Sequence, residues 1–261
     1  MFELLNLNLR FGLAGDPGER SWTRRKTALP ALFAVSDADF LCFQEVNDFQ
    51  EADLAALLPD HRRIGRWEPA PAFWQNNLIF YRNDWRCIRR DRFFLSPTPN
   101  LPSRFRDSRW PRQCTLGLFE KRGERVICAT THFDFRPGTQ LRSAGVLLDR
   151  LAVFAGSPSE IPAVLAGDFN ATPSSPAHDR FTRQGGFRNA FSPPFPGTFH
   201  GFTGKAGGEH IDWVLHRGDL GVAEARVETR AEGGLFPSDH FPLRVAFRRG
   251  RRLISRVSSS G

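Results

Sequence analysis

Two polar side chains stand at the end of an apolar run near the middle of the chain. Residues 163–167 are small or apolar, and Asp168 and Asn170 follow two positions apart. Because successive side chains of a strand alternate between its faces, both would leave the sheet on the same side. Such a carboxylate can orient and deprotonate a water, while the amide donates to a developing negative charge. Gly-Asp and Asn are also ordinary turn residues, so the pair alone leaves a plain polar turn open.

Other segments repeat this arrangement of an apolar strand that ends in a polar side chain. Further candidates lie at or beside the ends of expected strands: Asn8, Glu45, His132, Asp212, Asp239 and His240. Each alone fits a turn, a cap or a hydrogen-bonded structural residue, and Asn8 also fits the wet face of an edge strand. Together they would gather many polar groups in an otherwise apolar sheet protein, where unpaired buried polar groups are costly.

The oxygen-bearing members of this set favour a hard divalent cation. Glu45, Asn8 and Asp239 offer carboxylate and amide oxygens, which fit Mg²⁺ or Mn²⁺ better than structural zinc. His132 and His240 can donate hydrogen bonds to an anionic oxygen. With a carboxylate acting on water, this combination describes metal-assisted hydrolysis of a phosphate ester.

The charge of the chain fits an acidic partner. The 261 residues carry a formal net charge of +8, which favours nucleic acid, another phosphorylated substrate or a membrane surface, although a codon bias toward arginine explains it equally well. A long loop over residues 96–112 concentrates arginines. We expect Arg112, Arg109 and Trp110 to contact substrate phosphates there, with a solvated basic loop as the alternative.

The remaining pattern predicts one α/β domain over residues 1–247 and a basic, disordered tail over 248–261. We expect a hairpin of residues 77–82 and 88–95 that turns at Asn83-Asp84, and another of residues 115–119 and 125–131. Further strands are expected at 2–9, 39–46, 163–167, 211–215, 222–229 and 243–247, and helices at 24–35, 51–58, 139–154 and 177–183. Thr139 is expected to cap the third of these helices.

The four cysteines and the N-terminus predict a cytoplasmic protein with no membrane insertion. The cysteines form no CxxC pair, and Cys42 and Cys128 lie in apolar runs, as small buried residues do. Free thiols fit a reducing compartment. We expect no signal peptide, because no basic segment precedes the first apolar run, and no apolar run is long enough to span a bilayer.

The order of these motifs resembles the endonuclease/exonuclease/phosphatase superfamily, which has the deoxyribonuclease I-like fold. The resemblance extends from Asn8 to about residue 247 and rests on five motifs: LNLRFG at 7–12, FQEV at 43–46, GDFNATP at 167–173, IDWV at 211–214 and SDHFP at 238–242. It implies a four-layer sandwich, in which two mixed β-sheets pack face to face with helices outside. It also places the site at one end of the sheets.

The resemblance assigns a role to each candidate. Glu45 would bind the divalent metal with Asn8 beside it, and Asp239 would lie near the metal or the nucleophile. Asp168 would position the attacking water. The remaining four residues would act on the scissile phosphate: Asn170 and His132 directly, and His240 with Asp212 as its orienting carboxylate.

Two departures from relatives bear on the substrate. Deoxyribonuclease I-type members carry an acid where this chain has Gln75, Asn76 and Asn77, so a protonated His132 lacks its carboxylate partner. The inositol polyphosphate phosphatase signature is absent. We therefore predict a phosphodiesterase or nuclease acting on nucleic acid or nucleotides. The alternatives are a phosphomonoesterase acting on a small phosphorylated metabolite or phosphoinositide, and a non-catalytic polyanion-binding module.

Overall fold

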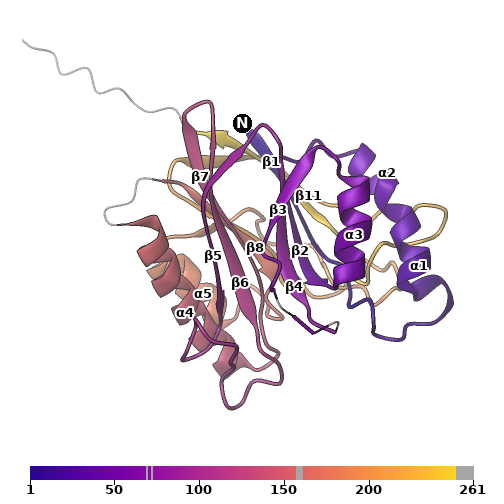
Figure 1. Ribbon diagram of the computed structural model, residues 1–261, viewed down its shortest axis with the longest axis horizontal. Coiled ribbons are helices and arrows are strands. Elements are labelled where there is room, and N and C mark those ends of the chain that lie inside the picture. The colour runs from indigo at the N-terminus through magenta and orange to yellow at the C-terminus, as the bar shows by residue number, and fades with distance from the viewer. Residues whose placement is uncertain (69, 72, 157–160, 251–261) are drawn as a thin grey trace, which may run out of the picture.

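Two β-sheets pack face to face in the computed structural model, which describes residues 1–68, 70–71, 73–156 and 161–250. Helices α1, α2 and α3 cover the outer side of one sheet, and α4 and α5 cover the outer side of the other (Figure 1). The predicted four-layer sandwich is confirmed.

The strands are β1 (Phe2–Asn8), β2 (Phe40–Val46), β3 (His61–Ile64), β4 (Asn76–Arg82), β5 (Arg86–Phe94), β6 (Gln113–Lys121), β7 (Glu124–His132), β8 (Ala163–Asp168), β9 (Arg188–Asn189), β10 (Asp212–Arg217), β11 (Leu220–Val227) and β12 (Leu243–Arg249). The helices are α1 (Trp22–Arg25), α2 (Leu29–Ala34), α3 (Asp48–Leu57), α4 (Pro137–Ala155) and α5 (Pro176–Asp179), with short turns η1 (Gly18–Arg20), η2 (Lys26–Ala28) and η3 (Arg180–Gln184).

The first sheet has the order β11-β12-β1-β2-β4-β3, and the second has the order β5-β6-β7-β8-β10-β9. Strand β1 is therefore internal, antiparallel to β12 and parallel to β2. Asn8 is buried on it, as is Asn6, so the edge-strand explanation for Asn8 is wrong.

Three apolar clusters follow from the alternation of side chains along the strands. Between the sheets, Leu4 and Cys42 of one sheet pack with Val164 of the other. Leu5 and its neighbours face the helices outside the first sheet, and a similar cluster joins the second sheet to α4. Because Asn8 and Asp168 fall on the inner faces, the pleat aims both between the sheets.

The expected hairpin at Asn83-Asp84 is wrong. Strand β4 pairs with β2 and β3 in the first sheet, whereas β5 pairs with β6 in the second. Trp85, in the segment that joins β4 to β5, is buried between the two sheets, and its indole N–H donates to Asp39 Oδ1 at 2.8 Å. Burial of this large side chain between the layers favours a crossing from one sheet to the other. The other predicted hairpin, β6 with β7, is confirmed.

Several element ends also differ from expectation. The helix expected over 24–35 is divided into α1, η2 and α2, with Pro30 at the start of α2, where a missing N–H costs least. Thr139 does not cap α4: its hydroxyl donates to Asp107 Oδ2 at 3.0 Å. Strand β12 continues to Arg249, two residues into the expected tail, and residues 251–261 of that tail lie outside the described part.

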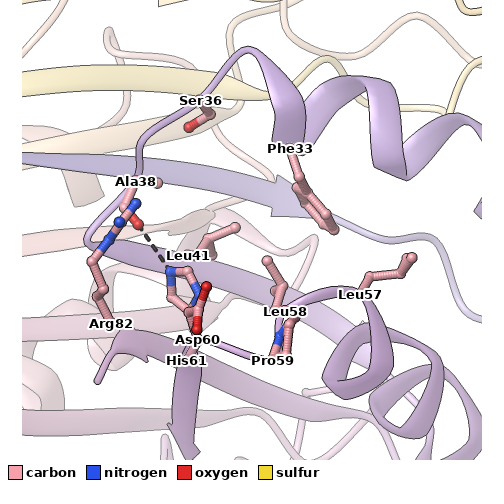
Figure 2. A pocket seen from close by; sticks show the side chains of 10 residues that line it. All are labelled: Phe33, Ser36, Ala38, Leu41, Leu57, Leu58, Pro59, Asp60, His61 and Arg82. Atoms are coloured by element: carbon pink, nitrogen blue, oxygen red, sulfur yellow. Dashed lines mark hydrogen bonds between the residues drawn. The ribbon is translucent and has the colours of Figure 1, made fainter. Parts of the chain in front are cut away.

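Cys42 and Cys128 are buried as expected and face each other between the sheets, with their sulfur atoms 3.7 Å apart. A cavity of about 170 Å³ lies at the N-terminal end of β2, where His61 Nε2 contacts the Ala38 carbonyl at 3.0 Å (Figure 2). This is the end of β2 opposite Glu45. Among the described helices, none is long and apolar enough to cross a membrane, and cytoplasmic location stays a prediction.

We predict acid lability from His216 of β10, which is buried and packs on Phe247 of the other sheet. Burial lowers its pKa from 6.5 to about 4, and its Nδ1 has no hydrogen-bond partner among the described residues. The unfolded chain therefore binds this proton first, so the free energy of unfolding should fall as pH drops from about 6.5 toward 4. In urea titrations at pH 7.5 and pH 5, His216→Leu should lose less stability than wild type. Equal losses would contradict the assignment.

Candidate active site

Three of the predicted residues are direct neighbours across adjacent strands of the second sheet. His132 at the end of β7 pairs in register with Asp168 of β8, which pairs in turn with Asp212 of β10. All three are buried. The sheet register alone therefore sets an imidazole and two carboxylates side by side.

Asn8 joins this row from the other sheet. Its Nδ2 lies 2.9 Å from Asp168 Oδ2 and 3.2 Å from Glu45 Oε1. Its Oδ1 accepts the backbone N–H of Arg10 at 2.8 Å, and since a backbone N–H can only donate, this bond fixes the amide orientation. Asn8 thus donates hydrogen bonds to two carboxylates. Its side-chain oxygen could bind a metal only if the amide group flipped by 180° about its χ2 torsion.

Glu45 reaches the site through a break in the strand pattern. Regular alternation would put Glu45 on the outer face with Phe43, but the register with β4 shifts between Phe43 and Val46, and Glu45 has φ +62°. A bulge of this kind redirects a side chain, at the cost of a strained backbone. One Glu45 carboxylate oxygen accepts from Asn8 and the other from the backbone N–H of Phe11.

His240 lies on the opposite side of Asp168 from His132. Its Nδ1 donates to Asp212 Oδ2 at 2.9 Å, and its Nε2 lies 3.8 Å from Asp168 Oδ2. The predicted Asp212–His240 hydrogen bond is therefore present. The Asp212 carboxylate fixes which ring nitrogen faces the site.

His132 is oriented by Arg112 rather than by a carboxylate. Arg112 Nη1 lies 2.9 Å from His132 Nδ1, and because a guanidinium can only donate, Nδ1 must accept. The ring proton then sits on Nε2, which lies 3.5 Å from Asp168 Oδ2. Asn77, which lies where deoxyribonuclease I-type relatives carry an acid, does not contact His132 in its place. Its amide donates to the Gln113 carbonyl at 2.7 Å.

The two imidazoles have opposite pKa shifts. Burial, with the nearby charge of Arg112, lowers the pKa of His132 well below 6.5. Burial also lowers the pKa of His240, but the charge and hydrogen bond of Asp212 outweigh it and raise that pKa to about 10. Burial raises the pKa of Asp168 to about 7. Near neutral pH, His240 is thus a cation and His132 is neutral.

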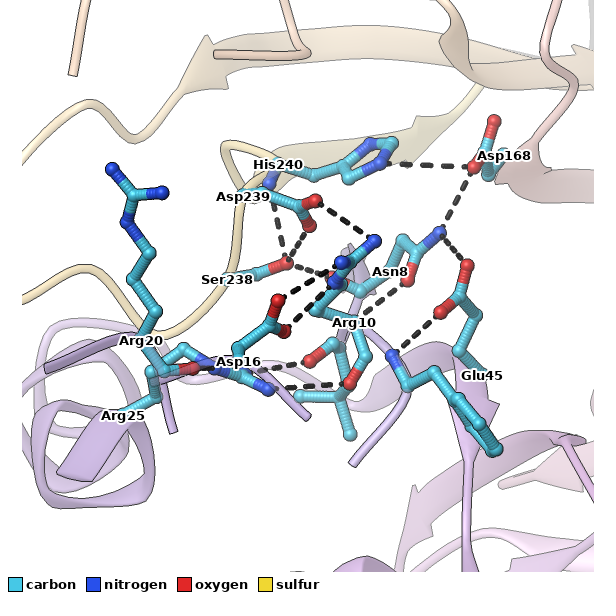
Figure 3. Close-up of polar contacts among 12 residues, drawn as sticks. Asn8, Arg10, Asp16, Arg20, Arg25, Glu45, Asp168, Ser238, Asp239 and His240 are labelled. Carbon is cyan, nitrogen blue, oxygen red and sulfur yellow. Dashed lines mark hydrogen bonds and ion pairs between the residues drawn. The ribbon is translucent and has the colours of Figure 1, made fainter. Parts of the chain in front are cut away.

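Asn170 and Asp239 border this group. The backbone N–H of Asn170 donates to Asp168 Oδ1 at 2.9 Å, and its side-chain amide donates to the Phe133 carbonyl. Asp239 lies 3.7 Å from Arg10 Nη1 and accepts from the Ser238 hydroxyl at 3.2 Å. Figure 3 shows Asp239 on the His240 side and Glu45 on the other side of Asn8.

The predicted substrate-binding residues divide into two groups. Arg112 is 6 % exposed, and no carboxylate of the described residues lies within 4.0 Å of its charged nitrogens. Arg109 and Trp110 are exposed, and their side chains contact each other, with the guanidinium 5.6 Å from the ring centroid. Only Arg112 therefore joins the buried group, whereas the other two stay candidates at the surface.

A residue that sequence reasoning missed, Arg25 of α1, ties the two halves of the site together. Its guanidinium donates to the carbonyls of Leu9, Pro237 and Arg20 at 2.7–2.8 Å. Figure 3 shows Arg25 beside Arg20. Leu9 follows Asn8, and Pro237 immediately precedes the segment that carries Asp239 and His240. Burial lowers the pKa of Arg25 to about 10, so it remains charged at neutral pH.

A sequence model of the endonuclease/exonuclease/phosphatase family matches residues 5–240. The chain belongs to this family, whose members are hydrolases of phosphate esters that depend on divalent metals. The predicted family membership is thus confirmed, and metal-dependent hydrolysis of phosphate esters is the activity of that family.

Solved structures show the same fold. An endonuclease/exonuclease/phosphatase family protein from Bacteroides thetaiotaomicron superposes with a TM-score of 0.84 at 24% identity, over 94% of this chain and 97% of that one. A mannosyl-6-phosphatase of the same organism gives 0.84 at 23% identity, over 95% and 100%. A curated relative, carbon catabolite repressor protein 4 homolog 5 of Arabidopsis thaliana, is 24% identical over 60% of this chain and 37% of its own. The chain thus spans little more than a third of that relative.

We predict that Arg25→Met lowers the free energy of unfolding by about 2–5 kcal/mol, because several buried carbonyls lose their donor. The matched control is Arg24→Met, since Arg24 is exposed and pairs with exposed Glu19; it should change stability by about 0.5 kcal/mol or less. Chemical denaturation of the three proteins measures both values. Equal losses in the two variants would contradict the role of Arg25.

Proposed function

We propose that this protein hydrolyses phosphodiesters of nucleic acid or nucleotides by attack of an activated water. The supporting observation is the position of Asp168, whose Oδ2 lies 2.9 Å from Asn8 Nδ2, 3.5 Å from His132 Nε2 and 3.8 Å from His240 Nε2. A carboxylate among donors from three directions can hold a water beside a bound phosphate. Its raised pKa of about 7 suits a general base near neutral pH.

The donor set fits Mg²⁺ or Mn²⁺ at Glu45, with Asp239 as a further oxygen ligand. Asp168, Asp212 and His240 also lie close enough to surround an ion. We favour Glu45, because His240 Nδ1 already donates to Asp212 and its ring is a cation near neutral pH. Bound at Glu45, the ion would supply Lewis-acid stabilisation of charge on the phosphate.

The surrounding donors would act on the phosphate oxygens. The His240 cation would donate from Nε2, with Asp212 holding its ring, and neutral His132 would donate from Nε2, with Arg112 holding its ring. Arg112 would add a buried positive charge that no described carboxylate neutralises directly. Asn170 would donate its amide to the developing charge. Such fixed donors need no reorganisation as negative charge develops.

A diester of nucleic acid is favoured by the formal charge of +8 and by the exposed pair of Arg109 and Trp110 on the loop that carries Arg112. A basic side chain beside an aromatic ring suits a phosphate next to a base. The second candidate is a phosphomonoester such as a sugar phosphate, favoured by the mannosyl-6-phosphatase whose fold the chain shares.

The test is a panel of phosphate esters assayed with and without metal. With Mg²⁺, bis-p-nitrophenyl phosphate and a short oligonucleotide should be cleaved with a kcat/KM at least about tenfold above that for p-nitrophenyl phosphate and mannose 6-phosphate. EDTA should abolish the activity, and excess Mg²⁺ or Mn²⁺ should restore it. Glu45→Gln should raise the Mg²⁺ concentration needed for half-maximal rate. Faster turnover of the monoesters would select the second candidate, and activity that survives chelation would contradict the metal assignment.

A further inference from the structure

Two exposed phenylalanines contact buried residues of the site. Phe135 is 57 % exposed, and the Arg112 guanidinium lies 5.6 Å from its ring centroid. Phe199 is 41 % exposed, and its ring packs against that of His240, with 5.0 Å between centroids and an angle of 64°. Ligand sites combine aromatic side chains with a small number of precisely placed polar groups, and both phenylalanines stand beside such groups.

The two rings lie on opposite sides of Asp168. Phe135 contacts Arg112, which is bonded to His132, and His132 approaches Asp168 from the β7 side. Phe199 contacts His240, which approaches the same carboxylate oxygen from the segment after Asp239. A phosphate held by these imidazoles would therefore have one aromatic side chain on each flank.

Backbone hydrogen bonds hold the segment that carries Phe199 in place. Its neighbours Thr198 and His200 pair with the segment of the site: the Thr198 carbonyl accepts from Phe241 N–H at 2.7 Å, and His200 N–H donates to the Asp239 carbonyl at 2.9 Å. The exposed ring is thus fixed at the edge of the site by the same strand-like pairing that positions His240.

Phe135 is held in a comparable way. The preceding Asp134 is 1 % exposed and accepts from the Ser108 hydroxyl and the Arg109 N–H at 2.8 and 2.9 Å. The following Arg136 is the residue before α4, and its N–H donates to Asp134 at 3.2 Å. Both aromatic side chains therefore stand on anchored segments, which is the arrangement that a preformed binding surface requires.

We infer that Phe135 and Phe199 form two walls that receive planar or apolar ester groups on either side of the scissile phosphate, nucleobases above all. This inference rests on the proposed phosphodiesterase function and narrows its substrate class. A diester carries a group on each side of phosphorus and can occupy both walls, whereas a sugar monophosphate leaves one wall in water. Stacking on an aromatic side chain changes affinity by about 5- to 100-fold per base.

The test compares two diesters with the same leaving group, thymidine 5′-(p-nitrophenyl phosphate) and methyl p-nitrophenyl phosphate. Wild type should prefer the nucleoside ester in kcat/KM by about 5- to 100-fold. Phe199→Ala or Phe135→Ala, whichever wall receives the nucleoside, should reduce that preference at least about fivefold. Tryptophan at the same position should restore it, and leucine should restore it only in part, because it has area without a planar face.

The control is Phe105→Ala, which removes a partly buried ring that packs on Arg142 of α4, 4.9 Å away. It should leave the preference for the nucleoside ester as in wild type. Equal kcat/KM for the two esters in wild type, or a preference that neither wall variant reduces, would overturn the inference while the hydrolase stands. Failure to cleave any ester in the presence of Mg²⁺ would instead overturn the proposed function.

Discussion

The hydrogen bond from Asn8 Nδ2 to Asp168 Oδ2, 2.9 Å long, crosses from one sheet to the other, and the site is built around it. Both side chains are buried, so each would leave an unsatisfied polar group without its partner. Further along the strands, away from the site, Gln44 Nε2 donates to Asn6 of its own sheet and to Thr130 of the other sheet, at 2.9 and 2.8 Å. This polar layer replaces the apolar packing that joins the sheets elsewhere. The end of the sandwich is thereby held together by the same groups that form the site.

The charges of the side chains around Asp168 depend on which groups each of them contacts in the fold. The imidazoles of His132 and His240 differ in protonation because one ring faces a guanidinium and the other a carboxylate. The site therefore contains a neutral donor and a cationic donor of the same residue type within reach of one carboxylate. Arg25 adds a buried cation behind the site. Its hydrogen bonds to carbonyls hold the backbone in place, and its charge also interacts with those of Asp239 and Glu45.

Much of this arrangement could be predicted from the sequence, and the parts that could not have physical reasons. Period-two alternation explains why Asn8 and Asp168 face inward, because both lie on regular strands. It does not set the side of Asn170, which the sequence pattern paired with Asp168, because β8 ends at Asp168 and Asn170 has φ +48°. Glu45 does not follow the alternation either: a bulge and a left-handed backbone turn it toward the site, which only the motif indicated. The chain reversal at Asn83-Asp84 has the composition of a hairpin, but burial of Trp85 carries the chain to the other sheet. The role of Arg25 left no signal, because its partners are carbonyls of residues up to 212 positions away.

We propose that the Asp168 carboxylate orients and deprotonates the attacking water. Asp168→Asn keeps the size of the side chain and one of the two oxygens that accept from Asn8 and from the Asn170 N–H, but it removes the base. Using the phosphodiester that wild type turns over fastest with Mg²⁺, kcat of this variant should fall by about 10²–10⁴-fold or more while its circular dichroism and unfolding midpoint stay close to wild type. A well-folded Asp168→Asn protein with kcat within a few-fold of wild type would contradict this role of Asp168.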